Sequence, residues 1–164
     1  MLFTEDVDES FEDLVLGPRR INPARVGGDF VVGRADTAAS IEPGYQSAVV
    51  IDDADDGVTR VLRGADLLTS AARQRQLARA LGLPPVAYGH FPLVVGPDGR
   101  RLAKRHGDTR LASLAARGVT AAEVRAWIAA SAGVPAEEAG RLVPRSFDPS
   151  RIPTEPVVPP PAWS

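Results

Sequence analysis

A cationic segment bounded by glycines is the part of the sequence best suited to chemistry. Residues 99–108 read Gly-Arg-Arg-Leu-Ala-Lys-Arg-His-Gly-Asp and follow an apolar run and a Gly-Pro-Asp-Gly turn. Guanidinium and ammonium groups on such a loop suit a polyphosphate, because they can follow the charge that moves during phosphoryl or nucleotidyl transfer. The same short pattern is also typical of a solvated basic turn, so the segment needs support from the rest of the chain.

The composition excludes several other kinds of site. The 164 residues include no cysteine and two histidines, which rules out disulfides, cysteine nucleophiles, thiolate zinc sites and His-rich metal sites. The net charge of -2 argues against non-specific coating of nucleic acid but leaves room for a local basic groove. No apolar run approaches the roughly 20 residues that span a bilayer, and the acidic N-terminus lacks a signal-peptide pattern. We therefore expect a cytoplasmic protein without a membrane or DNA partner.

Strands and helices alternate in the region that must position the cationic segment. We expect strands over residues 29–34, 58–63 and 86–95, and helices over residues 45–54 and from 69 or 70 to about 81. This order is a βαβαβ unit, half of a doubly wound parallel sheet, and predicts the α/β class. Ligands bind beyond the carboxyl ends of such strands. Because the cationic segment and Arg63 both follow strand ends, their positions favour the phosphate-site interpretation.

The flanking regions contain weaker signals. Residues 1–20 are compatible with an edge strand or a short helix, and residues 19–28 are expected to form a loop. After the cationic segment we expect a helix over 109–117 and another from the capping box at Thr120 and Glu123 to about residue 132. A third short helix is expected from Pro135. Residues 145–164 are rich in proline and predict an extended tail.

Three segments together resemble the class I glutamyl-tRNA synthetases, and above all their short paralogues, the glutamyl-Q tRNA(Asp) synthetases. Residues 45–53, Tyr-Gln-Ser-Ala-Val-Val-Ile-Asp-Asp, are similar to the family's YQLAVVVDD helix. Residues 57–68, followed by Arg73-Gln74, resemble GVTHVVRGADLL…PRQ, and residues 101–107 resemble the KLSKRHG form of the KMSKS loop. Residues 147–156 are similar to the paralogue's C-terminal end. The resemblance implies the second half of a Rossmann-like class I synthetase catalytic domain.

The resemblance also implies a role for each matching residue. Lys104 matches the KMSKS lysine, the catalytic residue that stabilises the ATP phosphates during adenylate formation. Arg101, Arg105 and His106 are placed beside it as further ATP contacts. An alternative interpretation treats these neighbours as solvent-exposed charges.

The amino-acid substrate is assigned by the same resemblance. Tyr45 and Arg63 match residues that bind glutamate, and a guanidinium suits a carboxylate because it donates two parallel hydrogen bonds. The implied reaction joins glutamate to the α-phosphate of ATP with loss of pyrophosphate, then transfers it to a hydroxyl of queuosine in tRNA(Asp). Mg²⁺ is expected with ATP, and no zinc site is expected in this chain. Alternatively, Arg63 pairs with Asp53 or Asp66, and Tyr45 packs at the start of its helix.

The chain departs from the family pattern in several places. The first half of the nucleotide fold, with the HIGH motif, is missing, and Ser47 replaces an apolar residue. We expect four parts: a remnant of the connective segment (1–28), half of the catalytic domain with the KMSKS-like loop (29–108), a helical region similar to a stem-contact domain (109–144) and the proline-rich tail (145–164).

Three hypotheses about activity follow from these departures. The chain is a portion of a glutamyl-Q synthetase that is inactive alone, or one subunit of a split enzyme whose HIGH-bearing half is a separate chain. In the third hypothesis it is a non-catalytic module that binds nucleotide or tRNA. His90, in an apolar run, is expected to be a hydrogen-bonded core or rim histidine, and Asp52 and Asp53 are expected to have structural roles.

Overall fold

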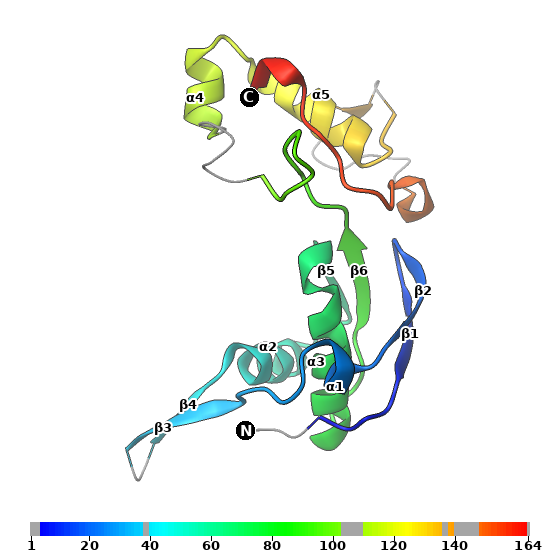
Figure 1. Cartoon of the computed structure of the whole chain (residues 1–164), viewed down its shortest axis with the longest axis vertical. Helices are drawn as coiled ribbons and strands as arrows, with labels where there is room; N and C mark the ends of the chain where they lie inside the picture. The colour runs from blue at the N-terminus through cyan, green and yellow to red at the C-terminus, as the bar shows by residue number, and fades with distance from the viewer. Residues whose placement is uncertain (1–3, 38–39, 103–109, 136–137, 140–147, 164) are drawn as a thin grey trace. The chain divides into compact units, whose positions relative to one another are not determined.

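The computed structural model describes residues 4–37, 40–102, 110–135, 138–139 and 148–163 (Figure 1). The chain divides into two compact units, Met1–His90 and Phe91–Ser164. In the described part of the chain, none of the helices has the length and apolarity for a bilayer crossing.

The first unit is built on a four-stranded sheet with the order β2-β1-β6-β5. Its strands are β1 (Glu9–Asp13), β2 (Gly17–Ile21), β5 (Arg60–Gly64) and β6 (Ala87–Phe91). β1 and β2 form an antiparallel hairpin in which Asp13 lies opposite Gly17, whereas β1 runs parallel to β6 with Asp13 opposite Tyr88. Asp13 therefore lies at the junction between the hairpin and the parallel part of the sheet.

Two helices pack beside this sheet and bury the apolar core. They are α2 (Tyr45–Asp55) and α3 (Leu68–Ala80), which contact each other, and α3 also contacts β1 (Figure 1). The short α1 (Pro23–Val26) packs on α3, and a 3-10 turn, η1 (Ala65–Leu67), leads into α3. The buried side chains of Phe30, Val50 and Leu77 form one cluster between these elements.

The start of α2 is tied to the preceding segment by polar contacts. The amide of Gly44 donates to the carbonyl oxygen of Val32 at 2.8 Å. The single O–H of Ser47 has two acceptors within reach, the same carbonyl and, at 2.9 Å, the carbonyl of Gly44. These bonds satisfy the buried hydroxyl, which explains how Ser47 is tolerated where the resemblance predicts an apolar residue.

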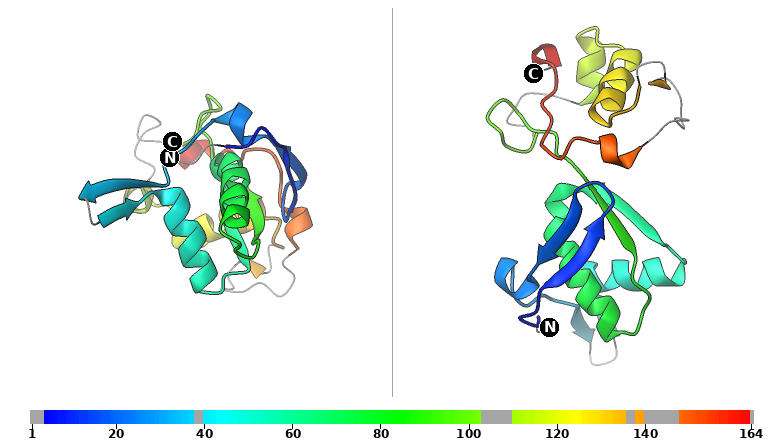
Figure 2. Two further views of the ribbon diagram at one scale, coloured as in Figure 1. Left: turned by 90° about the horizontal axis from the view of Figure 1, so that it is seen from below. Right: turned by 90° about the vertical axis from the view of Figure 1, so that its right-hand side faces the viewer.

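A separate hairpin replaces the strand that the sequence predicted over residues 29–34. β3 (Gly33–Thr37) pairs antiparallel with β4 (Ser40–Pro43), and this two-stranded ribbon projects from the body of the first unit (Figure 2). The prediction of a first sheet strand here was wrong, because β3 pairs with β4 in a separate two-stranded sheet and every residue of β4 is exposed. The position in the sheet is taken by β1, from the acidic N-terminal stretch.

The other predicted elements of this unit are found close to their expected positions. The helix at 45–54, the strand at 58–63 and the helix ending near 81 correspond to α2, β5 and α3, and the last strand is shorter than expected. The expected loop at 19–28 instead contains most of β2 and all of α1. The prediction of the α/β class is confirmed by this arrangement.

In the second unit the structure describes α4 (Leu111–Ala116), α5 (Ala121–Ser131) and the 3-10 turns η4 (Pro149–Arg151) and η5 (Pro161–Trp163). The predicted capping box is present: Thr120 Oγ1 accepts from the Glu123 amide at 3.2 Å, and Glu123 Oε2 accepts from the Thr120 amide at 2.7 Å. The described part of the proline-rich tail packs on this unit. Trp163 meets Trp127 edge to face at 5.4 Å between ring centroids.

Gly133, which follows α5, lies against the backbone of the C-terminal tail at Arg151. Its φ of +67° favours glycine, and a Cβ atom at this position would lie 2.4 Å from the Arg151 carbonyl oxygen. Gly118, which follows α4, has a similar φ of +85° but nothing within 4 Å of the same point. We expect Gly118→Ala to lower the free energy of unfolding by about 1–2 kcal/mol, the cost of left-handed backbone alone.

Gly133→Ala should cost clearly more, because backbone atoms must also move apart. Denaturant unfolding of the two variants, followed by tryptophan fluorescence, measures the difference. Equal losses of stability would show that the contact between residues 133 and 151 contributes nothing.

Candidate functional site

The centre of the candidate site is Arg63, near the end of β5. Its Nε donates to His90 Nε2 at 3.1 Å, Nη1 donates to Gln74 Oε1 at 2.8 Å, and Nη2 donates to the Leu67 carbonyl oxygen at 3.2 Å. The guanidinium carbon also lies 4.8 Å from the centroid of the Tyr88 ring, within the range of a cation–π contact. These bonds fix the side chain and leave one N–H on each terminal nitrogen for other partners.

A fully buried histidine and aspartate lie beneath Arg63. Asp13 Oδ2 lies 2.5 Å from His90 Nδ1, and Asp13 Oδ1 accepts from the His90 amide at 3.1 Å. Because His90 Nε2 accepts from Arg63, its proton must be on Nδ1, where it is donated to Asp13. The three groups are therefore an ionised aspartate, a neutral histidine and a charged arginine, in that order.

The pKa values of these groups agree with the order of charges. Burial lowers the pKa of His90, and the opposing effect of Asp13 does not restore it. Burial alone would raise the pKa of Asp13, but hydrogen bonds from His90 and from the amides of Leu16 and Val15 outweigh it and lower the pKa. Burial also lowers the pKa of Arg63, yet a guanidinium stays charged at neutral pH.

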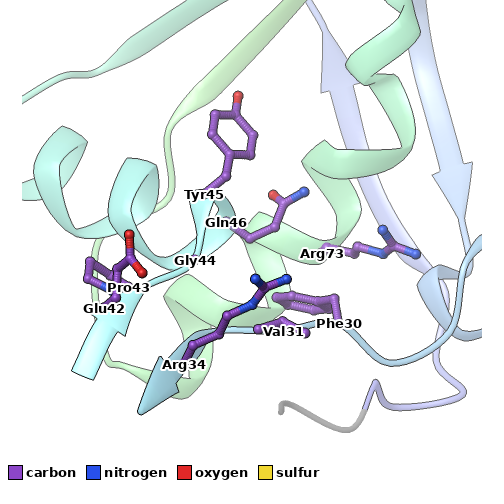
Figure 3. A pocket seen from close by; sticks show the side chains of 9 residues that line it. All are labelled: Phe30, Val31, Arg34, Glu42, Pro43, Gly44, Tyr45, Gln46 and Arg73. Atoms are coloured by element: carbon purple, nitrogen blue, oxygen red, sulfur yellow. The ribbon is translucent and has the colours of Figure 1, made fainter. Parts of the chain in front are cut away.

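A pair of glutamines connects Arg63 to a neighbouring cavity. Gln74, which is buried, donates through Nε2 to Gln46 Oε1 at 2.9 Å, and Gln46 Nε2 donates to the Ser70 hydroxyl at 3.2 Å. Gln46 lines a cavity of about 410 Å³ that also contacts Phe30, Arg34, Tyr45 and Arg73 (Figure 3). Two consecutive hydrogen bonds, from Arg63 to Gln74 and from Gln74 to Gln46, therefore link the guanidinium to the cavity wall.

The structure brings the two predicted glutamate-binding residues together. Tyr45 is the first residue of α2 and its side chain is 57% exposed. Burial lowers the pKa of Arg63, and the neighbouring Tyr45 hydroxyl opposes this shift without reversing it. Asp53 acts on Arg63 through its charge, and no ion pair between them is found among the described residues. The predicted roles of Tyr45 and Arg63 in binding glutamate stay predictions.

The predicted ATP-binding residues are placed only in part. Arg101 is exposed and its backbone pairs with Val95 in the second unit. Lys104, Arg105 and His106 lie outside the described residues. Within the described ranges, no group of three or more His, Asp or Glu side chains could hold a metal ion.

Sequence reasoning missed Asp13 and gave Gln74 no role. Asp13 lies among several acidic residues, and nothing local separates it from the others; its partner is 77 residues away. Gln74 belongs to a segment that matched the family pattern, which was the available signal for its importance. The expectation that His90 is a hydrogen-bonded core histidine is confirmed, since its side chain is fully buried.

Comparison with known proteins identifies the family. The model for class I tRNA synthetases (E and Q), catalytic domain, matches residues 2–135. The chain belongs to this family. This membership confirms the resemblance, and together with the mixed α/β sheet it confirms the Rossmann-like fold.

Individual relatives point to one branch of the family. The chain is 52% identical over 156 residues to a glutamyl-Q tRNA(Asp) synthetase of Symbiobacterium thermophilum, covering 93% of this chain and 46% of the relative. A protein of the same name from Rhodopirellula baltica is 46% identical over 141 residues, covering 85% of this chain and 43% of the relative. The chain thus spans about half the length of the curated relatives it matches.

The solved structures agree with this assignment at the level of the fold. A glutamate tRNA ligase from Elizabethkingia meningosepticum, in complex with its amino acid, aligns with a TM-score of 0.54 and 30% identity. The alignment covers 65% of this chain and 20% of that structure's chain.

The buried His90 predicts a pH-dependent stability. Its pKa in the fold lies below the value of about 6.5 expected for the unfolded chain, so the unfolded state binds more protons as the pH falls. We expect the free energy of unfolding to decrease between about pH 7 and pH 5, by at most ~1.4 kcal/mol per pH unit for one proton. Asp13, whose pKa is lowered, loses its contribution only below about pH 4, outside this window.

Urea unfolding across this range tests the assignment with a matched pair of variants. His90→Gln should flatten the pH dependence, whereas His106→Gln should keep it. Identical slopes in the wild type and His90→Gln would show that His90 is not the titrating group.

Proposed function

We propose that this chain supplies the glutamate-binding half of a glutamyl-Q tRNA(Asp) synthetase catalytic domain. The single observation that carries the proposal is the fixed Arg63 guanidinium with Tyr45 beside it, in a chain that belongs to the class I tRNA synthetases. The names of the curated relatives support glutamate and tRNA(Asp) as substrates.

Arg63 would bind one carboxylate of glutamate. An N–H of Arg63 that His90, Gln74, Leu67 and Tyr45 leave unused would donate to one carboxylate oxygen, and the Tyr45 O–H would donate to the other. Because His90, Gln74 and the Leu67 carbonyl already hold the guanidinium, little conformational entropy would be lost when the substrate binds. Preorganisation of this kind favours selection of an anionic amino acid.

The proposed reaction has two steps. A carboxylate oxygen of glutamate bonds to the α-phosphorus of ATP, and the bond to pyrophosphate breaks. The Lys104 ammonium would stabilise the charge that builds up on the phosphates, with Arg101, Arg105 and His106 as further contacts and Mg²⁺ bound to ATP. A hydroxyl oxygen of queuosine then bonds to the carbonyl carbon of the adenylate, and AMP leaves.

A second interpretation gives the same residues another context. In it the chain would act as one subunit beside a HIGH-bearing chain, or as a non-catalytic nucleotide- or tRNA-binding module. We expect no pyrophosphate exchange from the 164-residue chain alone. Exchange by the purified chain would contradict this expectation, and exchange only after a HIGH-bearing chain is added would identify a split enzyme.

Glutamate binding by the 164-residue chain tests the role of Arg63 directly. We expect Arg63→Gln to weaken binding by about tenfold or more, because a hydrogen-bonded pair with a charged group is worth about 1.5–3 kcal/mol. Tyr45→Phe, at an exposed position, should weaken binding less without affecting folding. Ligand-observed NMR measures both effects.

Arg60→Gln is the matched control, since Arg60 is exposed on the same strand and carries the same charge. If Arg60→Gln and Arg63→Gln weaken glutamate binding equally, Arg63 is not the carboxylate ligand.

The proposed role of Lys104 can be tested by chemical labelling because of the composition of the chain. Lys104 is the single lysine in the 164 residues, so an amine-directed acylating reagent has only this side chain and the N-terminal amine as targets. We expect ATP with Mg²⁺ to protect Lys104 from labelling, while the N-terminal amine serves as an internal control. Peptide mass spectrometry measures both sites, and equal labelling of Lys104 with and without ATP would contradict phosphate binding by this residue.

A further inference from the structure

Asp13 is joined to the Arg63 guanidinium through one imidazole ring. The side chains of Asp13 and His90 are fully buried, so neither is open to a substrate. His90 Nδ1 nevertheless lies 2.5 Å from Asp13 Oδ2, and His90 Nε2 accepts from Arg63 Nε at 3.1 Å. Whatever Asp13 imposes on the imidazole is therefore felt by the guanidinium.

The backbone fixes how the Asp13 carboxylate is turned. Its Oδ1 accepts from three amides, those of Val15 at 3.0 Å, Leu16 at 2.9 Å and His90 at 3.1 Å. Because all three partners are donors, Oδ1 must remain an acceptor, and Oδ2 is the atom left to face the imidazole. An ionised carboxylate has no proton to give, so Asp13 offers His90 Nδ1 an acceptor only.

The proton on the imidazole is placed by this carboxylate. With its proton on Nδ1, His90 keeps a lone pair on Nε2 for the Arg63 Nε–H. In the other neutral tautomer, two N–H groups would face each other across the same 3.1 Å. The Leu67 carbonyl oxygen, which accepts from Arg63 Nη2 at 3.2 Å, also lies beside His90. An Nε2 proton would therefore compete with Arg63 for this oxygen as well.

The imidazole plane is held by packing. The Tyr88 ring stacks on His90 with 6.0 Å between ring centroids and an interplanar angle of 23°, and Arg63 lies over the same Tyr88 ring. The ring is thus fixed by its neighbours, whereas the choice of protonated nitrogen is left to hydrogen bonding. Asp13 controls that choice.

We propose that Asp13 is a positioning residue for the glutamate site: it holds His90 as the Nδ1–H tautomer and so provides an acceptor for Arg63 Nε. The identity of the ligand at Arg63 rests on the proposed function. With Nε, Nη1 and Nη2 all hydrogen-bonded, the guanidinium is oriented before the substrate arrives. A change of tautomer would release one of these bonds without removing the charge of Arg63.

Asp13→Asn is the variant that changes the tautomer with the least change of shape. The asparagine oxygen must still accept from the three backbone amides, so its NH₂ group would face His90 Nδ1 and donate to it. Nδ1 then becomes the acceptor, and the ring proton moves to Nε2. The same replacement in a catalytic triad leaves the histidine in the wrong tautomer.

Nitrogen-15 NMR of the labelled 164-residue chain measures the tautomer, because protonated and unprotonated ring nitrogens have different chemical shifts. The His90 signals are those missing from His90→Gln. We expect Nδ1–H in the wild type and Nε2–H in Asp13→Asn, whose folding circular dichroism checks. The Arg63 Nε proton, assigned by its absence from Arg63→Gln, should exchange with solvent about tenfold faster in Asp13→Asn, because one hydrogen bond is lost.

Glutamate binding, followed by ligand-observed NMR, measures the consequence at the site. We expect Asp13→Asn to weaken binding about three- to tenfold, the effect of one lost hydrogen bond. The loss should be smaller than that of Arg63→Gln, because the guanidinium keeps its charge.

His90→Gln separates positioning from a general effect on the fold. An amide oxygen at this position can accept from Arg63 Nε, and an amide has no tautomer for Asp13 to select. Adding Asp13→Asn to His90→Gln should therefore change glutamate binding by less than about twofold. Equal losses from Asp13→Asn in the wild type and in His90→Gln would show that Asp13 acts through the fold alone and would overturn the proposal.

Two further results would overturn it. One is a wild-type spectrum at neutral pH with a proton on His90 Nε2, a measurement that needs no folded variant. The other is unchanged exchange of the Arg63 Nε proton in Asp13→Asn. If Asp13→Asn does not fold, His90→Asn replaces it, since this shorter amide can donate to Asp13 but does not reach Arg63. It should lose the Nε protection that His90→Gln retains, and equal exchange in the two would contradict the proposal.

Failure of this inference is distinguishable from failure of the proposed function. If Arg63→Gln binds glutamate as well as the wild type does, the proposed function fails, while the tautomer and the exchange rate still decide whether Asp13 orients Arg63. If Arg63→Gln loses glutamate binding and Asp13→Asn does not, the proposed function stands and Asp13 is not a positioning residue.

Discussion

The burial of a charged carboxylate beneath Arg63 is the constraint on which the first unit depends. Asp13 has no access to water, so its charge must be satisfied by hydrogen bonds, and it accepts them from His90 and from its own turn. These bonds join the N-terminal hairpin to β6. Loss of Asp13 would leave the imidazole and the guanidinium without the group that orients both, so one residue connects the sheet to the site.

The chain of hydrogen bonds through Asp13, His90 and Arg63 also separates negative from positive charge. Asp13 is ionised, His90 is neutral and Arg63 is charged, so the negative end is buried and the positive end lies near Tyr45. Proton transfer within the cluster would neutralise the buried carboxylate and weaken its hold on the imidazole. The arrangement is therefore suited to binding an anion, and chemistry by acid–base catalysis is not needed from these residues.

Local signals in the sequence predicted a large share of the fold. Helices α2 and α3 follow from periodicity and from the glycine stops at Gly57 and Gly82, and α5 follows from its capping box. All of these signals act within a few positions of the chain. The sheet was predicted less well. The apolar residues 30–32 indicated a strand, but Gly33 and the polar residues after it turn the chain into an exposed ribbon, and β1 occupies the sheet instead. Strand partners depend on contacts distant in sequence, which periodicity does not report.

In the candidate site, too, residues with local signals were predicted and residues with distant partners were not. The distant contact also affects how the site forms during folding. Arg63 and Tyr45 were found through short motifs, whereas Asp13 was not, because its partner His90 lies 77 residues along the chain. A contact of such separation forms late and slowly relative to helices. As the polypeptide emerges from a ribosome, the N-terminal hairpin must wait for β6 before Asp13 can be buried. The orientation of Arg63 is thus completed only once nearly the whole first unit has been synthesised.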